Sequence, residues 1–199
     1  MSSLAFVFPG QGSQAIGMLN GFAGNAVVAD TIAEASDALK VDLATLIAEG
    51  PKESLDLTTN TQPVMLACAV AFYRAWIAAG GATPAVVAGH SLGEYSALVA
   101  AGVIDFKDAV PLVRFRAQAM QEAVPVGAGA MAAILGLDSA QVVEGCKQAR
   151  ESFGAGSPEV VEAVNFNDTA QTVIAGSKAA VDKACEVLKG MGAKRALPL

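Results

Sequence analysis

A serine between two glycines, in the run Gly89-His90-Ser91-Leu92-Gly93, constrains this chain more than any other feature. The preceding run, Ala85–Ala88, is short, apolar and partly β-branched, which is typical of a buried strand. Residues 92–101 are expected to form a helix that ends at Gly102. Strand, sharp turn and helix in this order are the layout of a nucleophile elbow, whose glycines let neighbouring backbone and a substrate carbonyl approach the serine. Ser91 is therefore the predicted nucleophile.

Two alternatives stay open at this point. The chain has 20 glycines in 199 residues, so the pattern also arises by chance around a serine that only caps a helix. Separately, Gly10, Gly12 and Ala15 fit a dinucleotide-binding pattern, with a second strand over Ala26–Ala29 and Asp30 as the ribose-binding acid. Three further glycines would interrupt the crossover helix of that site at up to about 1 kcal/mol each, which disfavours it.

Composition excludes several classes of protein. Hydrophobic residues make up 53% of the chain and charged residues 16%, which excludes disorder. No apolar run approaches the roughly 18 residues of a membrane span, and a net charge of −6 disfavours nucleic acid as a partner. With one histidine and no Cys-x-x-Cys we expect no metal site. No signal peptide is recognised and the three cysteines suit reduced core thiols, so we expect a cytoplasmic protein.

The pattern of apolar runs predicts an α/β fold in two parts. Residues 1–126 are expected to form an α/β-hydrolase-like core with a parallel sheet. Its expected elements are a strand over 4–8, one helix over 31–47, a helix from a cap at Thr61 or Gln62 to Ala79, and a helix over 105–123 that starts with a capping box and is bent or broken at Pro111.

A glycine-rich stretch over 125–129 is the expected boundary, and residues 127–199 are expected to form a small ferredoxin-like subdomain. The order of its expected elements is βαββαβ. These elements are strands over 130–135, 162–167, 172–175 and 194–199, and helices over 139–149 and 178–191.

Several stretches in the same order resemble one enzyme family. The chain is similar to the malonyl-CoA:acyl carrier protein transacylases of fatty acid synthesis and to the related acyltransferase domains of multidomain synthases. The matching stretches are Phe6–Gln14, Thr59–Pro63, Gly89–Ala97, Arg116 with Gln121–Pro125, Met131–Gly136, Asn165–Asn167 and Val173–Gly176.

The resemblance implies an acyltransferase that uses no cofactor and moves a malonyl group from malonyl-CoA to the phosphopantetheine thiol of acyl carrier protein through an ester on Ser91. It assigns the oxyanion hole to the backbone N–H groups of Gln11 and Leu92, and the malonyl carboxylate to Arg116. Arg114 and Arg116 are about 200° apart around a helix, so only one of them faces a given pocket. Gln62 and Asn165, in matching motifs, are further candidates for substrate binding.

The resemblance implies that the general base is a histidine in a loop soon after the strand corresponding to Ala193–Leu199, beyond residue 199, and that further segments return to the larger α/β core, which is therefore incomplete over residues 1–126. His90, the one histidine of this chain, is next to Ser91 and its side chain should point away from the hydroxyl. We therefore expect the chain to be the N-terminal part of a transacylase, at best weakly active alone and monomeric when full length. Acyl carrier proteins are acidic, so Lys189, Lys194 and Arg195 are candidates for docking them. The alternatives are a serine esterase or thioesterase with the same elbow, and an inactive fragment that only binds carrier protein or a partner chain.

Overall fold

The structure of the chain is a computed structural model that describes residues 3–125 and 127–199. It divides into two units, residues 1–123 and 124–199, and each is described here by itself. The sequence predicts the boundary between residues 126 and 127. Residue 126 lies outside the described residues.

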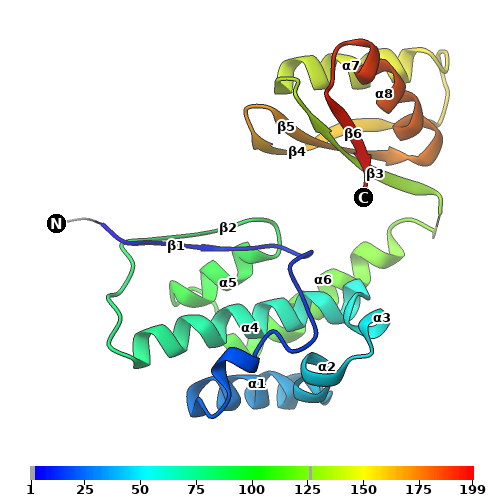
Figure 1. Cartoon of the computed structure of the whole chain (residues 1–199). Helices are drawn as coiled ribbons and strands as arrows, with labels where there is room; N and C mark the ends of the chain where they lie inside the picture. The colour runs from blue at the N-terminus through cyan, green and yellow to red at the C-terminus, as the bar shows by residue number, and fades with distance from the viewer. Residues whose placement is uncertain (1–2, 126) are drawn as a thin grey trace. The chain divides into compact units, whose positions relative to one another are not determined.

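The first unit contains a sheet of two parallel strands, β1 (Ala5–Phe8) and β2 (Val86–Gly89) (Figure 1). These strands position the loops that follow them. One face of this sheet packs on α4 (Thr58–Ala78) and α5 (Gly93–Ala100), where Phe8, Ala69 and Ala97 are buried together. The other face is open, since Val7 is 78% exposed. The sheet therefore rests on helices from one side only within this unit.

The remaining helices of the first unit surround α4. They are η1 (Asn20–Phe22), α1 (Ala26–Leu39), α2 (Leu43–Glu49), α3 (Lys52–Leu55) and α6 (Phe106–Glu122). Helix α4 is buried on every side from Thr61 to Ala71, as its nearly all-apolar circumference predicts. It is the central helix of the unit and packs against α1, α5 and α6.

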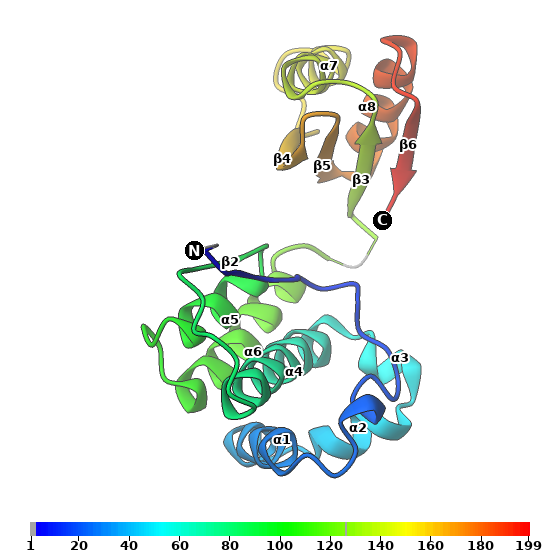
Figure 2. The same cartoon turned by 60° about the vertical axis from the view of Figure 1, so that its left-hand side comes forward.

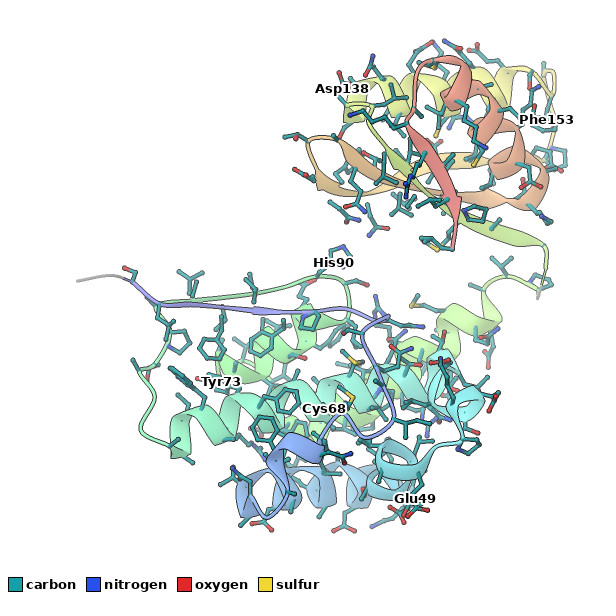
Figure 3. The ribbon with its side chains drawn as sticks, in the orientation of Figure 1. Glu49, Cys68, Tyr73, His90, Asp138 and Phe153 are labelled. Carbon is teal, nitrogen blue, oxygen red and sulfur yellow. The ribbon has the colours of Figure 1, made fainter. Side chains whose placement is uncertain are left out.

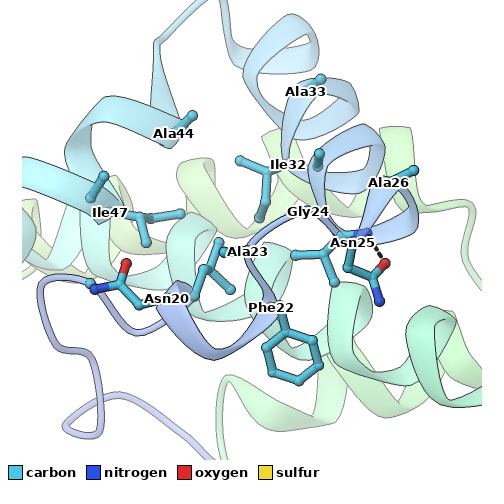
Figure 4. A pocket seen from close by; sticks show the side chains of 15 residues that line it. Asn20, Phe22, Ala23, Gly24, Asn25, Ala26, Ile32, Ala33, Ala44 and Ile47 are labelled. Carbon is cyan, nitrogen blue, oxygen red and sulfur yellow. Dashed lines mark hydrogen bonds between the residues drawn. The ribbon is translucent and has the colours of Figure 1, made fainter.

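The single helix predicted over 31–47 is wrong. Helix α1 begins earlier, where the Asn25 side chain accepts a hydrogen bond from the N–H of Val28 (dashed in Figure 4), and it ends at Lys40, whose φ of 58° is left-handed. A new cap at Asp42 starts α2. Residues 26–29 are helical rather than extended, so the second strand that a dinucleotide site requires is absent and that alternative is wrong.

Three local expectations in the first unit also need correction. Helix α4 begins at Thr58, because the Thr61 hydroxyl donates to the carbonyl oxygen of Leu55 at 2.6 Å instead of capping the helix. Asp105 precedes α6 but makes no side-chain cap, so the predicted capping box is wrong. Helix α6 is continuous through Pro111, so a break there is wrong, while a bend stays a prediction.

The second unit is a four-stranded antiparallel sheet in the order β4-β5-β3-β6. Its two helices pack on one face, where Ala132, Ile134 and Ile174 are buried (Figure 2). The capping box in this unit joins Asp138 and Gln141 at the start of α7. This βαββαβ order confirms the expected ferredoxin-like arrangement. Its elements are β3 (Gly129–Leu135), α7 (Ser139–Glu151), β4 (Val161–Asp168), β5 (Gln171–Ser177), α8 (Lys178–Gly190) and β6 (Arg195–Pro198).

Parallel and antiparallel sheets together confirm the mixed α/β class. In the ranges 3–125 and 127–199, none of the helices combines the length and the apolar character that crossing a bilayer requires.

Candidate active site

The carboxyl ends of β1 and β2 bring two predicted site loops together. Phe8 lies opposite Gly89 in the sheet, and the N–H of His90 donates to the carbonyl oxygen of Phe8 at 3.1 Å. Because the strands are parallel, the loop after β1 and the turn after β2 leave the sheet at the same edge, where open α/β sheets bind ligands. Figure 3 shows His90 on the turn after β2, and a Cβ built on Gly10 would lie 3.3 Å from His90 Nδ1.

Ser91 has the strained backbone of a nucleophile elbow. Its φ is 52°, a left-handed value that only Lys40 shares among the non-glycine residues of the described ranges. Both flanking glycines are required sterically: a Cβ on Gly89 would lie 2.0 Å from the carbonyl carbon of Gly93, and one on Gly93 would lie 2.1 Å from Phe8 O. The Ser91 side chain makes no cap to α5. The simple capping alternative is therefore wrong, and the residue is exposed at the surface of its unit.

Two backbone donors stand beside this serine turn. Leu92 precedes the first turn of α5, and Gln11 lies in the loop after β1. Within the part of the chain that the structure describes, neither backbone N–H donates to another protein group. Unpaired N–H groups at a helix start and in a neighbouring loop are the donors that an oxyanion hole uses.

The loop after β1 is tied to the start of α4 by contacts that the sequence did not indicate. The side-chain amide of Gln11 donates to the Thr58 hydroxyl at 3.1 Å, and that of Gln14 donates to Asp56 Oδ1 at 2.9 Å. The Gln14 side-chain oxygen also accepts from the N–H of Gly12 at 2.8 Å. Hydrogen bonds from Lys52 and Gln14 lower the pKa of Asp56, so this carboxylate stays charged and anchors the loop.

Arg116, on α6, reaches the serine directly. Its Nη2 donates to Ser91 Oγ at 3.0 Å, its Nη1 donates to Gln62 Oε1 at 2.7 Å, and its guanidinium carbon lies 5.8 Å from the centroid of the Tyr95 ring. Arg114, two residues earlier, instead donates to Asn60 at 2.8 Å, and burial lowers its pKa. Only one of the two arginines contacts Ser91, as the helical spacing predicts.

Of the remaining predicted site residues, Gln62 belongs to the first unit and the others belong to the second. Gln62 is 0% exposed, so its contact with the site runs through Arg116. Asn165, on β4, belongs to the second unit and stays a prediction. So do Lys189, at the end of α8, and the exposed Lys194 and Arg195 at the start of β6.

A hollow of about 450 Å³ lies beside the elbow, lined by the ends of both strands and by His90. A separate hollow of about 420 Å³, between η1, α1 and α2, is lined by alanines, glycines and other apolar residues with only two asparagines (Figure 4). None of the predicted site residues lines this hollow. The described residues hold no cluster of three or more His, Cys, Asp or Glu side chains that suits a metal ion.

Comparison with known proteins agrees with this geometry. Residues 5–197 match the family described as "Acyl transferase domain". The chain belongs to the acyl transferase family. The chain is 56% identical over 200 residues to the malonyl CoA-acyl carrier protein transacylase of Escherichia coli K12, covering 100% of its own length and 63% of the relative.

Solved structures show the same likeness. The chain superposes on an acyl-carrier-protein S-malonyltransferase from Burkholderia pseudomallei with a TM-score of 0.94 at 66% identity, covering 100% of this chain and 62% of that one. It also matches a malonyl-transacylase solved in complex with its type II PKS acyl-carrier protein, with a TM-score of 0.93, 53% identity and coverage of 100% and 62%. The chain thus spans less than two thirds of these relatives' length.

Proposed function

We propose that this chain belongs to an enzyme that moves a malonyl group from malonyl-CoA to the phosphopantetheine thiol of acyl carrier protein, in fatty acid biosynthesis in the cytoplasm. One observation carries the proposal: Arg116 donates to Ser91 Oγ at 3.0 Å. An elbow serine suits acyl transfer in general. A guanidinium beside it suits an acyl group that ends in a carboxylate, which an arginine binds through two parallel hydrogen bonds.

In the first half of the proposed reaction, Ser91 Oγ attacks the thioester carbonyl carbon of malonyl-CoA. The N–H groups of Gln11 and Leu92 donate hydrogen bonds that stabilise the negative charge developing on the carbonyl oxygen. As the tetrahedral intermediate collapses, the carbon–sulfur bond breaks, CoA leaves as the thiol with the serine proton, and a malonyl ester remains on Ser91. CoA and phosphopantetheine therefore act as carriers of the substrate rather than as cofactors of the protein.

In the second half, the phosphopantetheine thiol of the carrier protein attacks the ester carbonyl. The same two donors stabilise the second intermediate, and the Ser91 hydroxyl is restored. Arg116 holds the malonyl carboxylate through both halves of the reaction, while the side chain of Gln62 fixes the guanidinium by accepting a hydrogen bond from Nη1. An acyl group without a carboxylate leaves this guanidinium unpaired, so the site favours malonyl over acetyl groups.

The proposal assigns the general base to a histidine outside these 199 residues, as the family resemblance implies. The isolated chain would then keep weak activity through the oxyanion donors and Arg116. A nucleophile without its base retains part of its catalysis through binding and the oxyanion hole.

Docking of the acidic carrier protein is proposed for Lys189, Lys194 and Arg195. No ion pair involves these three residues in the described parts of the chain, whereas Lys178 and Lys183 pair with Asp182 and Glu186. Reversing the charge of the three unpaired residues should slow transfer to carrier protein at low salt and leave acylation by malonyl-CoA unchanged. Reversal of Lys178 and Lys183 is the matched control, and an equal loss in both sets would place docking elsewhere.

One incubation separates the proposal from its alternatives. The chain is mixed with radiolabelled malonyl-CoA, with and without the unmatched part of the Escherichia coli relative supplied in trans, and holo carrier protein is then added. A transacylase retains label on the chain and passes it to the carrier protein. An esterase or thioesterase releases free malonate, and a fragment that only binds partners takes up no label in either condition.

A further inference from the structure

The side chain of Gln62 is enclosed between two residues of one helix. Gln62 is 0% exposed, and both ends of its amide contact α6: Oε1 accepts from Arg116 Nη1 at 2.7 Å, and Nε2 lies 3.4 Å from Met120 Sδ. Arg116 and Met120 are four residues apart, so they lie on the same face of the helix. The two ends of the amide are thus matched to a donor and to an acceptor on one surface.

This arrangement fixes which way the amide points. A flipped amide would set its NH₂ group against the guanidinium, donor against donor, and its oxygen against the thioether, acceptor against acceptor. A buried amide nitrogen needs a partner, and the Met120 sulfur is the acceptor that the structure gives it. The sulfur therefore keeps Oε1 directed at Arg116, which in turn leaves Nη2 directed at Ser91.

We propose that Met120 is a positioning residue, whose thioether orients the Gln62 amide and through it aligns Arg116 for a carboxylate. The inference rests on the proposed function for the identity of that carboxylate, but its structural basis is the contact between Met120, Gln62 and Arg116 alone. Met120 is 51% exposed, so its contribution to the apolar core is small compared with its contact to the amide.

Two substitutions at this position give opposite results under the two possible roles. Met120→Leu keeps apolar bulk but removes the acceptor, while Met120→Gln removes apolar character but supplies a carbonyl oxygen within reach of Nε2. If Met120 orients the amide, the leucine variant raises the KM for malonyl-CoA about threefold to tenfold with little change in kcat, and the glutamine variant stays within about twofold. If Met120 serves only as packing, leucine preserves the KM and glutamine raises it, which would overturn the proposal.

The measurement uses the chain complemented in trans, with Gln118→Leu, an exposed position on the same helix, as the control for a surface change. Crystal structures of both variants give a second readout that needs no activity. The contact between Gln62 Oε1 and Arg116 Nη1 should be lost in Met120→Leu and kept in Met120→Gln. If the wild-type protein takes up no malonyl label, the proposed function fails, but these crystal structures still decide the role of Met120. An unchanged contact in Met120→Leu contradicts it.

Discussion

Arg116 donates a hydrogen bond from Nη2 to Oγ of Ser91 across 3.0 Å. The residues come from different elements, α6 and the turn between β2 and α5, and are joined only because α6 packs along α4 and α5. The group proposed to bind the substrate carboxylate thus contacts the proposed nucleophile. Under the proposed function, a carboxylate that binds this guanidinium would replace its contact with the serine hydroxyl, and substrate binding and activation of the serine would be linked at one side chain.

Replacement of this guanidinium should change which acyl group is transferred. Arg116→Ala is expected to lower the preference for malonyl-CoA over acetyl-CoA by about tenfold or more, because a charged hydrogen-bonded pair is lost. Arg116→Lys should keep part of the preference, since it retains the charge but not the planar fork. A competition assay with both thioesters measures the ratio.

Arg114→Ala is the matched control for that assay. Arg114 lies on the same helix but bonds Asn60 rather than Ser91, so the variant should retain the malonyl preference. An Arg116→Ala enzyme as selective as the wild type would show that another group recognises the carboxylate.

The Tyr95 ring should contribute to substrate binding through Arg116. The guanidinium carbon lies 5.8 Å from the ring centroid, a cation–π distance at which the interaction contributes about twofold to fivefold in affinity. Tyr95→Leu should raise the KM for malonyl-CoA by this factor, whereas Tyr95→Phe, which keeps the ring, should not. Equal effects of the two substitutions would assign the role to the tyrosine hydroxyl or to packing.

The strand–turn–helix around Ser91 was predictable because its determinants are local. Glycines at 89 and 93 are required by contacts within the turn and with β1, and these leave a direct pattern in the sequence. The break between α1 and α2 is also local, with caps at Asn25 and Asp42. It was missed because apolar residues on both sides continue one helical period, and Lys40 is an unusual residue for a left-handed helix end.

The support around Arg116 was not predictable from the sequence. Gln62 and Arg116 are 54 residues apart, and their contact depends on how α4 and α6 are aligned in space. The Gln11 loop is likewise tied to Thr58, 47 residues away. Sequence periodicity indicates which face of a helix is buried, but not which polar residue on one helix meets which on another.

The elbow glycines should be essential for stability. A Cβ at position 93 would lie 2.1 Å from Phe8 O, a backbone atom that cannot move without disturbing β1. Gly93→Ala is expected to lower the free energy of unfolding by at least about 2 kcal/mol, measured by urea denaturation. Gly21→Ala is the control, since a Cβ there meets nothing within 4 Å and the φ is not left-handed. A Gly93→Ala variant as stable as this control would contradict the tight turn.

Alkaline pH should weaken the first unit through Cys68. Burial raises the pKa of this thiol to about 12. In the unfolded chain the pKa of a cysteine is about 8.5. Below that pH the thiol is protonated in both states and contributes no pH dependence. Between about pH 9 and 12 the unfolded chain binds fewer protons than the native one, so the free energy of unfolding falls by up to about 1.4 kcal/mol per pH unit.

Comparison with Cys68→Ala isolates this effect, because tyrosines and lysines titrate alike in both proteins. The wild type should lose stability more steeply with rising pH above about 9. Parallel pH curves for the two proteins would show that the Cys68 thiol ionises freely in the native state.

The most direct test of the account is the site of malonyl attachment. The chain, complemented in trans, is incubated with malonyl-CoA in the absence of carrier protein, quenched in acid and analysed by peptide mass spectrometry. One malonyl ester is expected, on Ser91, and it should disappear in Ser91→Ala and after addition of holo carrier protein. A malonyl group on any other residue, or label that survives the Ser91→Ala substitution, would contradict this expectation.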